Sequence, residues 1–352
     1  MAVVQALRSG AWRVVELLST PLVPADYLDE IAPLRNPGVL RCRIEQVRPE
    51  TRDAVTLVLR PGRGFRPHEP GQYVRLGVDV DGVRRWRAYS VTSAPGGLSV
   101  TVNAVPGGVV SNHLIAHARP GQVLHLDQAA GDFVLPPDRP AKVLFVTAGS
   151  GVTPVMGMLR THLGELRDVV VVHSAPIPEA VVFGAELREL AASGRIRLVE
   201  RHTRADGRLT PEALAALVPD LAERHTWACG PNGMLDDLGA YWDEAGLAGR
   251  LHVERFRPAT AAIGEGGKVT FGRTGTVVDA DGSVPLLEAG EAAGVLMPSG
   301  CRMGICFTCV LPLTGGAVRD LRDGRLTTVT EGEVVPVQTC VSAAAGPCHL
   351  DH

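Results

Sequence analysis

The sequence predicts a multidomain chain: a β-barrel, then a doubly wound α/β domain, then a small α+β domain. Three observations support this order. Short strands separated by turns fill residues 39–138, strands alternate with helices over residues 139–260, and four of the five cysteines within residues 261–352 follow a recognisable spacing. A chain of 352 residues is long enough for two or three domains.

Residues 1–38 are expected to form a helical extension before the first domain. Residues 11–18 carry an apolar stripe with helical spacing, and the Thr20-Pro21 pair marks a break. Arg8 and Arg13 interrupt the apolar residues near the N-terminus, so this segment does not resemble a secretory signal.

The β-barrel prediction for residues 39–138 depends on strand periodicity and turn residues. Residues 39–44, 54–59 and 98–103 are rich in apolar and β-branched residues, and several alternate with a period of two. Pro-Gly pairs such as Pro70-Gly71 separate the strands.

The α/β prediction for residues 139–260 depends on a change of rhythm. Apolar strands are followed by amphipathic helices, and such alternation produces a parallel, doubly wound sheet. Thr210 and Pro211 suit the N-cap and the first position of one helix. The expected strands are residues 142–147, 168–173, 196–200 and 226–229, and the expected helices include residues 186–192 and 211–217.

The C-terminal cysteines form the most specific pattern in the chain. Cys301, Cys306 and Cys309, followed by Cys340, have the spacing C-x₄-C-x₂-C…C, which is typical of plant-type 2Fe–2S sites. Zinc sites more often pair two C-x₂-C units, and a disulfide set does not suit a chain expected in a reducing compartment. We therefore predict that these four thiolates hold a 2Fe–2S cluster.

A second motif lies near the end of an expected barrel strand. Strand alternation puts Arg87 and Tyr89 of the R-x-Y-S sequence on one face, where arginine can pair with a phosphate and tyrosine can stack on a flat heterocycle. Residues 106–111 offer glycine amides and a hydroxyl before a helix-like segment, and a helix N-terminus favours phosphate. The alternative is a barrel tyrosine beside a surface ion pair.

A third motif, G-x-G-x-x-P, follows the first strand of the α/β segment. Gly149 and Gly151 allow the backbone to approach a pyrophosphate at a helix N-terminus. Thr153 is expected to cap that helix and Pro154 to start it. The last position is proline rather than the glycine of the usual dinucleotide fingerprint.

Two further features of this segment concern a nucleotide. Residues 229–234 read C-G-P-x-x-M after another strand, although Cys229 alone would be interpreted as a small buried apolar residue. Ser174 ends the second strand, and Arg201 and Arg204 follow the third. A hydroxyl and two guanidiniums at that edge favour a ribose 2′-phosphate, so NADPH is expected in preference to NADH.

Together, and in this order, the motifs resemble the ferredoxin–NADP reductase superfamily, in the form with a fused C-terminal plant-type 2Fe–2S domain. Residues 17–28, 72–82 and 173–175 resemble the actinobacterial NADPH oxidoreductases that reduce fatty acyl-CoA desaturases. The resemblance implies a flavin-binding barrel, a nicotinamide-binding α/β domain and a ferredoxin-like β-grasp domain. Phe307 departs from it, because a polar residue is expected inside the cysteine loop.

The resemblance also implies site residues. Catalytic roles fall on Ser90 near the flavin N5, on Cys229 beside the nicotinamide and on Glu254. The candidate flavin-binding residues are Arg87, Ala88, Tyr89, Ser90, Asn103, Val105, Gly108, Val110, Ser111 and Phe256. The candidate nucleotide-binding residues are Thr147, Gly149, Gly151, Thr153, Pro154, Ser174, Arg201, Arg204, Cys229, Gly230, Pro231 and Met234.

The implied function is electron transfer from NAD(P)H through a flavin and the 2Fe–2S cluster to a protein acceptor, a fatty acyl desaturase or a hydroxylase or oxygenase. FAD is expected rather than FMN, because residues 107–111 resemble the pyrophosphate loop of FAD-dependent relatives. Two alternatives remain open: a flavin oxidase or diaphorase that reduces small acceptors, and an electron carrier that uses the cluster alone.

Composition limits the partners. A formal net charge of −3 gives no reason to expect nucleic acid, and no apolar run approaches the ~20 residues that span a bilayer. A cytoplasmic protein is expected, one that would reach a membrane only through an acceptor such as a membrane di-iron desaturase. Residues 263–352 carry ten acidic and six basic residues, which either steer this domain toward a basic acceptor or form an ordinary solvated surface.

Overall fold

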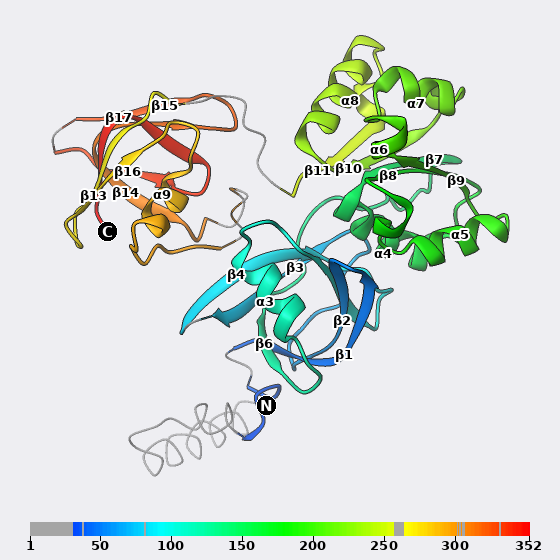
Figure 1. Cartoon of the computed structure of the whole chain (residues 1–352), viewed down its shortest axis with the longest axis horizontal. Helices are drawn as coiled ribbons and strands as arrows, with labels where there is room; N and C mark the ends of the chain where they lie inside the picture. The colour runs from blue at the N-terminus through cyan, green and yellow to red at the C-terminus, as the bar shows by residue number, and fades with distance from the viewer. Residues whose placement is uncertain are drawn as a thin grey trace, which may run out of the picture.

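The structure is a computed structural model, and it describes residues 31–36, 39–80, 82–256, 264–300, 302, 304, 307–330 and 332–352. The described part of the chain forms three domains, each built around its own sheet (Figure 1). Most of the expected extension at residues 1–38 lies outside the described residues. The multidomain fold class is confirmed, whereas the domain boundaries stay predictions.

The barrel domain is an antiparallel sheet with the strand order β4-β3-β6-β1-β2-β5. A bridge between Val91 and Val100 joins the ends of the sheet and closes it. Alternate side chains, among them Ile44, Leu57 and Leu76, fill the interior. Its elements are β1 (Arg41–Thr51), β2 (Ala54–Pro61), β3 (Tyr73–Val80), β4 (Val83–Ser90), β5 (Leu98–Asn103), α3 (Val109–His117) and β6 (Val123–Leu126).

The first barrel strand continues well past the predicted end at residue 44. Register shifts between Ile44 and Gln46 and between Pro49 and Thr51 allow β1 to stay paired with β2. Most side chains of this second half are exposed or partly exposed, so the apolar alternation that predicted the strand stops before the strand does.

The parallel-sheet domain has the strand order β11-β10-β7-β8-β9, with all neighbours parallel. Helices α4 and α5 cover one face and α7 and α8 the other, each with its own apolar cluster. The elements are β7 (Lys142–Ala148), α4 (Val152–His162), β8 (Asp168–Ala175), α5 (Gly184–Ala192), β9 (Arg197–His202), α6 (Thr203–Asp206), α7 (Pro211–Leu217), β10 (His225–Cys229), α8 (Asn232–Glu244) and β11 (Leu251–Glu254).

One helix start was predicted correctly and another was not. The Thr210 hydroxyl accepts a hydrogen bond from the Ala213 amide at 3.2 Å, which confirms the cap of α7. The expected cap at Thr153 is wrong, because a 3₁₀ turn at Gly149–Gly151 runs directly into α4 at Val152. The Thr153 side chain lies inside the first turn and donates to the Ser150 carbonyl at 2.9 Å.

The C-terminal domain is a mixed sheet in which β12 and β17 are parallel and the other pairs are antiparallel. Helix α9 packs on it through Leu286 and Leu287. Cys348 is fully buried in this core, where burial raises the pKa of its thiol to about 11. The elements are β12 (Gly267–Phe271), β13 (Thr276–Ala280), α9 (Leu286–Ala292), β14 (Val310–Asp320), β15 (Leu326–Val329), β16 (Val335–Gln338) and β17 (Ser342–Leu350).

Across the described residues, none of the helices is both long enough and apolar enough to cross a bilayer.

Candidate functional site

The R-x-Y-S motif occupies the end of β4, with Ser90 as the last residue of the strand. Arg87 has lost most of its solvent, and its Nη1 donates to the Trp86 carbonyl at 2.7 Å. Burial, followed by the nearby charge of Arg302, lowers the pKa of Arg87 to about 10. A desolvated guanidinium beside a second cation is suited to bind an anion.

Tyr89 lies on the same face of β4 as Arg87. Its hydroxyl is buried and has no hydrogen-bond partner among the described residues, and burial raises its pKa. A buried phenol without a partner is a group that a ligand can satisfy. Ala88 lies between the two on the opposite face of the strand, and Ser90 is buried.

The loop between β5 and α3 is held by its own side chains. The Val105 amide donates to the Ser111 hydroxyl at 3.3 Å, and the Asn112 side chain donates to the Val105 carbonyl at 3.0 Å. Gly108 is the N-cap of α3, and within the described chain no side chain caps the helix there. The first-turn amides are therefore available to phosphate oxygens. Val110 begins the buried face of α3, and Asn103 ends β5.

The glycine motif brings the carboxyl ends of β7 and β10 into contact. A Cβ atom at Gly151 would lie 2.0 Å from the Cys229 carbonyl oxygen, so no larger residue fits there. Gly149 has φ +55° and open space around it. Thr153 and Pro154 follow in the buried first turn of α4, and Gly230 and Pro231 lead from β10 into α8, which contains Met234. The backbone fits a pyrophosphate that approaches this edge.

Cys229 and Glu254 are register partners at the ends of β10 and β11. Burial, followed by the charge of Asp132, raises the pKa of Glu254 to about 7. Burial and the Glu254 charge raise the pKa of the Cys229 thiol well above its usual value, so this thiol is neutral. Phe256, two residues after Glu254, is exposed.

The candidates for a 2′-phosphate lie at the same carboxyl edge. Ser174 and Arg201 are register partners on β8 and β9, and the buried Ser174 hydroxyl has no partner in the described structure. Arg201 donates through Nε to the Gly207 carbonyl at 3.0 Å and through Nη2 to that of Asp206, so its guanidinium is partly engaged. The Arg204 side chain is exposed.

Cys309 and Cys340 lie together beneath the C-terminal domain surface. Both are buried, and the hydrogen bond from the Cys340 side chain lowers the pKa of Cys309 to about 6, which favours the thiolate that iron requires. The Thr339 hydroxyl donates to the Cys309 carbonyl at 2.9 Å. Cys301 and Cys306 lie outside the described residues, and without them no described group of three or more metal-ligating side chains remains.

Further contacts hold the loop that leads to Cys309. The carbonyl of Gly304 accepts hydrogen bonds from Gln338 at 2.8 Å and from Arg322 at 3.2 Å. Phe307, the departure noted in the sequence, has φ +55° and is 66% exposed. The two described thiols and the anchored loop fit an iron–sulfur cluster.

Two residues near these sites, His173 and Asp132, were not predicted as site residues. Thr147 and His173, at the ends of β7 and β8, share a hydrogen bond of 2.8 Å between Oγ1 and Nδ1, and burial lowers the pKa of His173 to about 4. Asp132 lies in the segment after β6 and acts electrostatically on Glu254. A buried strand marked His173 as core, whereas no local pattern marks Asp132.

Comparison with known families agrees with this geometry. Family models for an oxidoreductase FAD-binding domain, an oxidoreductase NAD-binding domain and a 2Fe-2S iron-sulfur cluster binding domain match residues 64–135, 145–239 and 269–345. These matches identify FAD, a nicotinamide nucleotide and a 2Fe–2S cluster as the cofactors.

Individual relatives point the same way. An NADPH oxidoreductase of Mycobacterium tuberculosis is 49% identical over 357 residues, covering 98% of this chain and 92% of the relative. The glycine betaine monooxygenase reductase subunit of Pseudomonas aeruginosa is 31% identical over 322 residues, covering 81% and 87%. The solved phthalate dioxygenase reductase shares the fold, with a TM-score of 0.58 at 23% identity and with 90% and 98% of the two chains covered. The chain therefore belongs to the ferredoxin–NADP reductase family of NAD(P)H-dependent flavin oxidoreductases, in the form that carries a C-terminal 2Fe–2S domain.

Proposed function

We propose that this protein is the reductase of an oxygenase or desaturase system, which accepts hydride from NADPH and delivers single electrons to a protein acceptor. The observation that carries the proposal is the direct contact between the barrel and C-terminal domains. Arg75 Nη1 on β3 donates to the Thr308 hydroxyl at 3.3 Å, and Thr308 precedes the cluster ligand candidate Cys309. We call residues 301–309 the cluster loop. Electrons that leave a barrel-bound flavin therefore have a short route to it.

Bound FAD supplies the conversion between two-electron and one-electron chemistry. Around it, Arg87 binds phosphate, the Tyr89 ring packs on the flavin and Ser90 offers a hydrogen bond to the ring edge. The loop at Gly149 and Gly151 binds the nucleotide pyrophosphate.

Hydride transfer between the nicotinamide and the flavin needs a site from which water is excluded. The neutral Cys229 thiol is fully buried beneath this edge of the sheet, and Glu254 can hold a proton near neutral pH. We propose that these two side chains exclude water and orient the nicotinamide for hydride transfer.

We propose a fatty acyl desaturase, such as a membrane di-iron desaturase, or a hydroxylase as the acceptor. Relatives named glycine betaine monooxygenase reductase subunit and 3-ketosteroid-9-alpha-monooxygenase ferredoxin reductase component support an oxygenase-type acceptor. The acidic excess of residues 263–352 favours an acceptor with a basic docking face.

The test separates the two halves of the pathway. NADPH should reduce the flavin of the Cys309→Ser protein at the wild-type rate, because the barrel and parallel-sheet domains do not use that thiolate. Reduction of a desaturase or cytochrome acceptor should fall at least a hundredfold. Ferricyanide reduction, which can occur at the flavin, serves as the control. Undiminished reduction of the protein acceptor would show that electrons leave from the flavin, as in a diaphorase.

A further inference from the structure

A cluster of charges joins the barrel domain to the C-terminal domain. Arg85 of β4 and Arg302 of the cluster loop approach the same carboxylate oxygen of Glu291 on α9. The distance from Arg85 Nη1 is 3.7 Å, and Arg302 Nη2 makes a direct ion pair. Arg302 directly follows the cluster ligand candidate Cys301. The Glu291 carboxylate thus connects strand β4 of the barrel domain to the cluster loop.

This group of charged side chains carries more positive than negative charge. Arg87 lies two residues after Arg85, on the same face of β4. The charged groups that act on Arg87 are Arg302, Glu291 and Arg85, together with the Tyr89 hydroxyl. Two guanidiniums therefore approach the Glu291 carboxylate, and a third, that of Arg87, interacts with it electrostatically. Desolvated like charges at such a density need a further anion nearby.

Unused hydrogen-bond donors show where that anion would bind. The Nε atoms of Arg85 and of Arg302 are buried, and neither has a hydrogen-bond partner among the described residues. A buried donor left without an acceptor destabilises a protein by the full desolvation penalty of the group. Two such donors from two domains, beside the phosphate-binding candidate Arg87, indicate an acceptor with several charged oxygens.

We propose that Arg302 and Arg85 complete the phosphate site of the bound FAD, so that the cluster loop of the C-terminal domain holds the cofactor of the barrel domain. The inference rests on the proposed flavin site at Arg87. A phosphate offers several charged oxygens to planar guanidiniums, which bind it through paired hydrogen bonds. Glu291 holds the two arginines in place before the phosphate arrives.

This arrangement links two equilibria. If FAD binds Arg302 only when the domains are docked, FAD must strengthen docking by the same factor by which docking strengthens FAD binding. The flavin and the cluster loop are then fixed relative to each other whenever the cofactor is present, which is the geometry that electron transfer requires.

The test compares flavins with and without phosphate on the full-length apoprotein that retains its cluster. Arg302→Gln and Arg85→Gln should each weaken FAD and FMN binding roughly tenfold to a hundredfold, as expected for a lost charge-assisted hydrogen bond. Riboflavin, which has no phosphate, should bind these variants and the wild type within about twofold. Arg273→Gln removes an exposed arginine of the C-terminal domain, ion-paired with Asp351, and should change none of the three affinities.

Each other outcome has a definite meaning. Unchanged FAD and FMN affinities in both variants would overturn the proposal. An equal loss of riboflavin affinity would also overturn it, since it would show a general effect on the barrel. The 2Fe–2S absorption spectrum of each variant reports whether the C-terminal domain is intact, and Arg85→Gln leaves that domain unaltered. Arg87→Gln tests the flavin site separately: if it fails to distinguish FMN from riboflavin, the assignment of Arg87 itself is wrong.

Discussion

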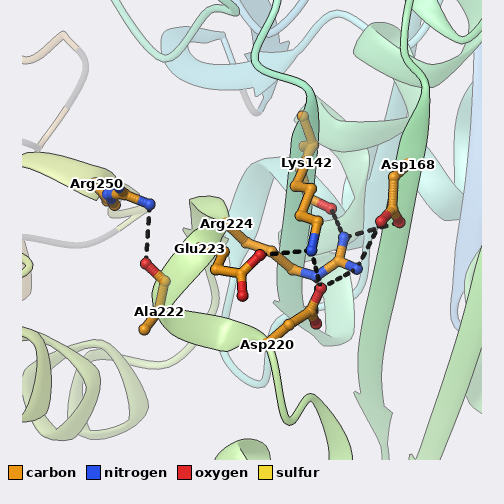
Figure 2. Close-up of polar contacts among 8 residues, drawn as sticks. Lys142, Asp168, Asp220, Ala222, Glu223, Arg224 and Arg250 are labelled. Atoms are coloured by element: carbon orange, nitrogen blue, oxygen red, sulfur yellow. Dashed lines mark hydrogen bonds and ion pairs between the residues drawn. The ribbon is translucent and has the colours of Figure 1, made fainter.

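The two edges of the parallel sheet differ in how their polar groups are bonded. At the amino edge, Arg224 pairs with Asp168 at 2.9 Å and with Asp220 at 2.8 Å, and Lys142 pairs with Asp220 and Glu223 (Figure 2). Hydrogen bonds from Arg224 and Lys142 lower the pKa of Asp220 to about 2. Each charged group drawn in this network has an opposite charge or a carbonyl as its partner.

At the carboxyl edge of the same sheet, several buried polar atoms of the described residues lack a hydrogen bond, although His202 Nε2 lies 3.6 Å from the Glu200 carboxylate. The Ser174 hydroxyl and the Nε2 atoms of His173 and His202 have no hydrogen-bond partner in the part of the chain that the structure describes. All three lie on the last residues of β8 and β9. Their desolvation lowers the stability of the free protein.

The difference separates stability from binding. Charges at the amino edge neutralise one another and fasten β7, β8 and the start of β10 together. Groups at the carboxyl edge keep their hydrogen-bonding capacity for a ligand, as expected where open α/β sheets bind nucleotides. Substitutions at the two edges should therefore fail in different assays.

The largest effect is expected at the carboxyl edge from Gly151→Ala. The added Cβ would lie 2.0 Å from the Cys229 carbonyl, so the loop and β10 must separate and the nucleotide site must open. Flavin reduction by NADPH in stopped-flow should slow more than a hundredfold, with FAD and cluster retained. Gly164→Ala, which follows α4 and lies outside the glycine motif, is the matched control: its Cβ meets open space without a positive φ, so flavin reduction should be unchanged. Equal losses in the two variants would contradict this reading of the edge.

Arg224→Met should produce the second effect, confined to stability. Removing the buried guanidinium leaves Asp168 and Asp220 without their main partner. Because both carboxylates keep contact with water, the lost hydrogen bonds to charged groups should destabilise by about 1.5–3 kcal/mol. The free energy of unfolding in urea reports the loss, while KM for NADPH should stay within twofold. Arg250→Met, which removes one hydrogen bond to the Ala222 carbonyl, should destabilise by less than about 1.5 kcal/mol (Figure 2). A raised KM for the Arg224 variant would show that the edges are coupled.

Glu254 gives the carboxyl edge a pH-dependent weakness. Its pKa is about 7 in the folded protein against an ordinary value of 4.5, because burial and Asp132 disfavour the carboxylate. Between these two values the folded state binds a proton that the unfolded state has released, so stability falls as the pH rises through 7. Above pH 7 the penalty approaches roughly 3 kcal/mol.

Glu254→Gln should therefore gain stability over the wild type as the pH rises from 4.5 to 8 and match it near pH 4. Urea unfolding at several pH values measures the difference. A difference that stays constant with pH would place the titrating group elsewhere.

The sequence predicted more of the fold than of the contacts between domains. Period-two alternation located β2 and β5, and the cap at Thr210 located α7, because these signals are local. The short strand β11 was missed, since four residues, none of them fully buried, carry little periodicity.

The candidate sites show the same limit. Arg87, Gly151 and Cys309 could be predicted from the sequence, because each belongs to a short motif of neighbouring residues. The charges around Glu291 come from elements more than 200 residues apart, Arg85 on β4 and Glu291 on α9, and no local sequence pattern predicts that they come together. Only tertiary packing brings these charged side chains together.

The smallest expected effect concerns the choice of coenzyme at the carboxyl edge. The unpaired Ser174 hydroxyl can donate to a 2′-phosphate, and its register partner Arg201 is partly engaged by two carbonyls, whereas Arg204 is exposed and free to approach. We expect the wild type to prefer NADPH, and we expect Ser174→Ala and Arg204→Ala each to lower kcat/KM for NADPH about tenfold, the size of one hydrogen bond to a charged group. The values for NADH should stay within twofold, because NADH lacks the phosphate, and Arg201→Ala should have the weaker effect on NADPH. A wild type that prefers NADH, or an NADPH preference that survives all three substitutions, would assign these polar groups to the domain's own packing and remove the contrast between the two edges at this position.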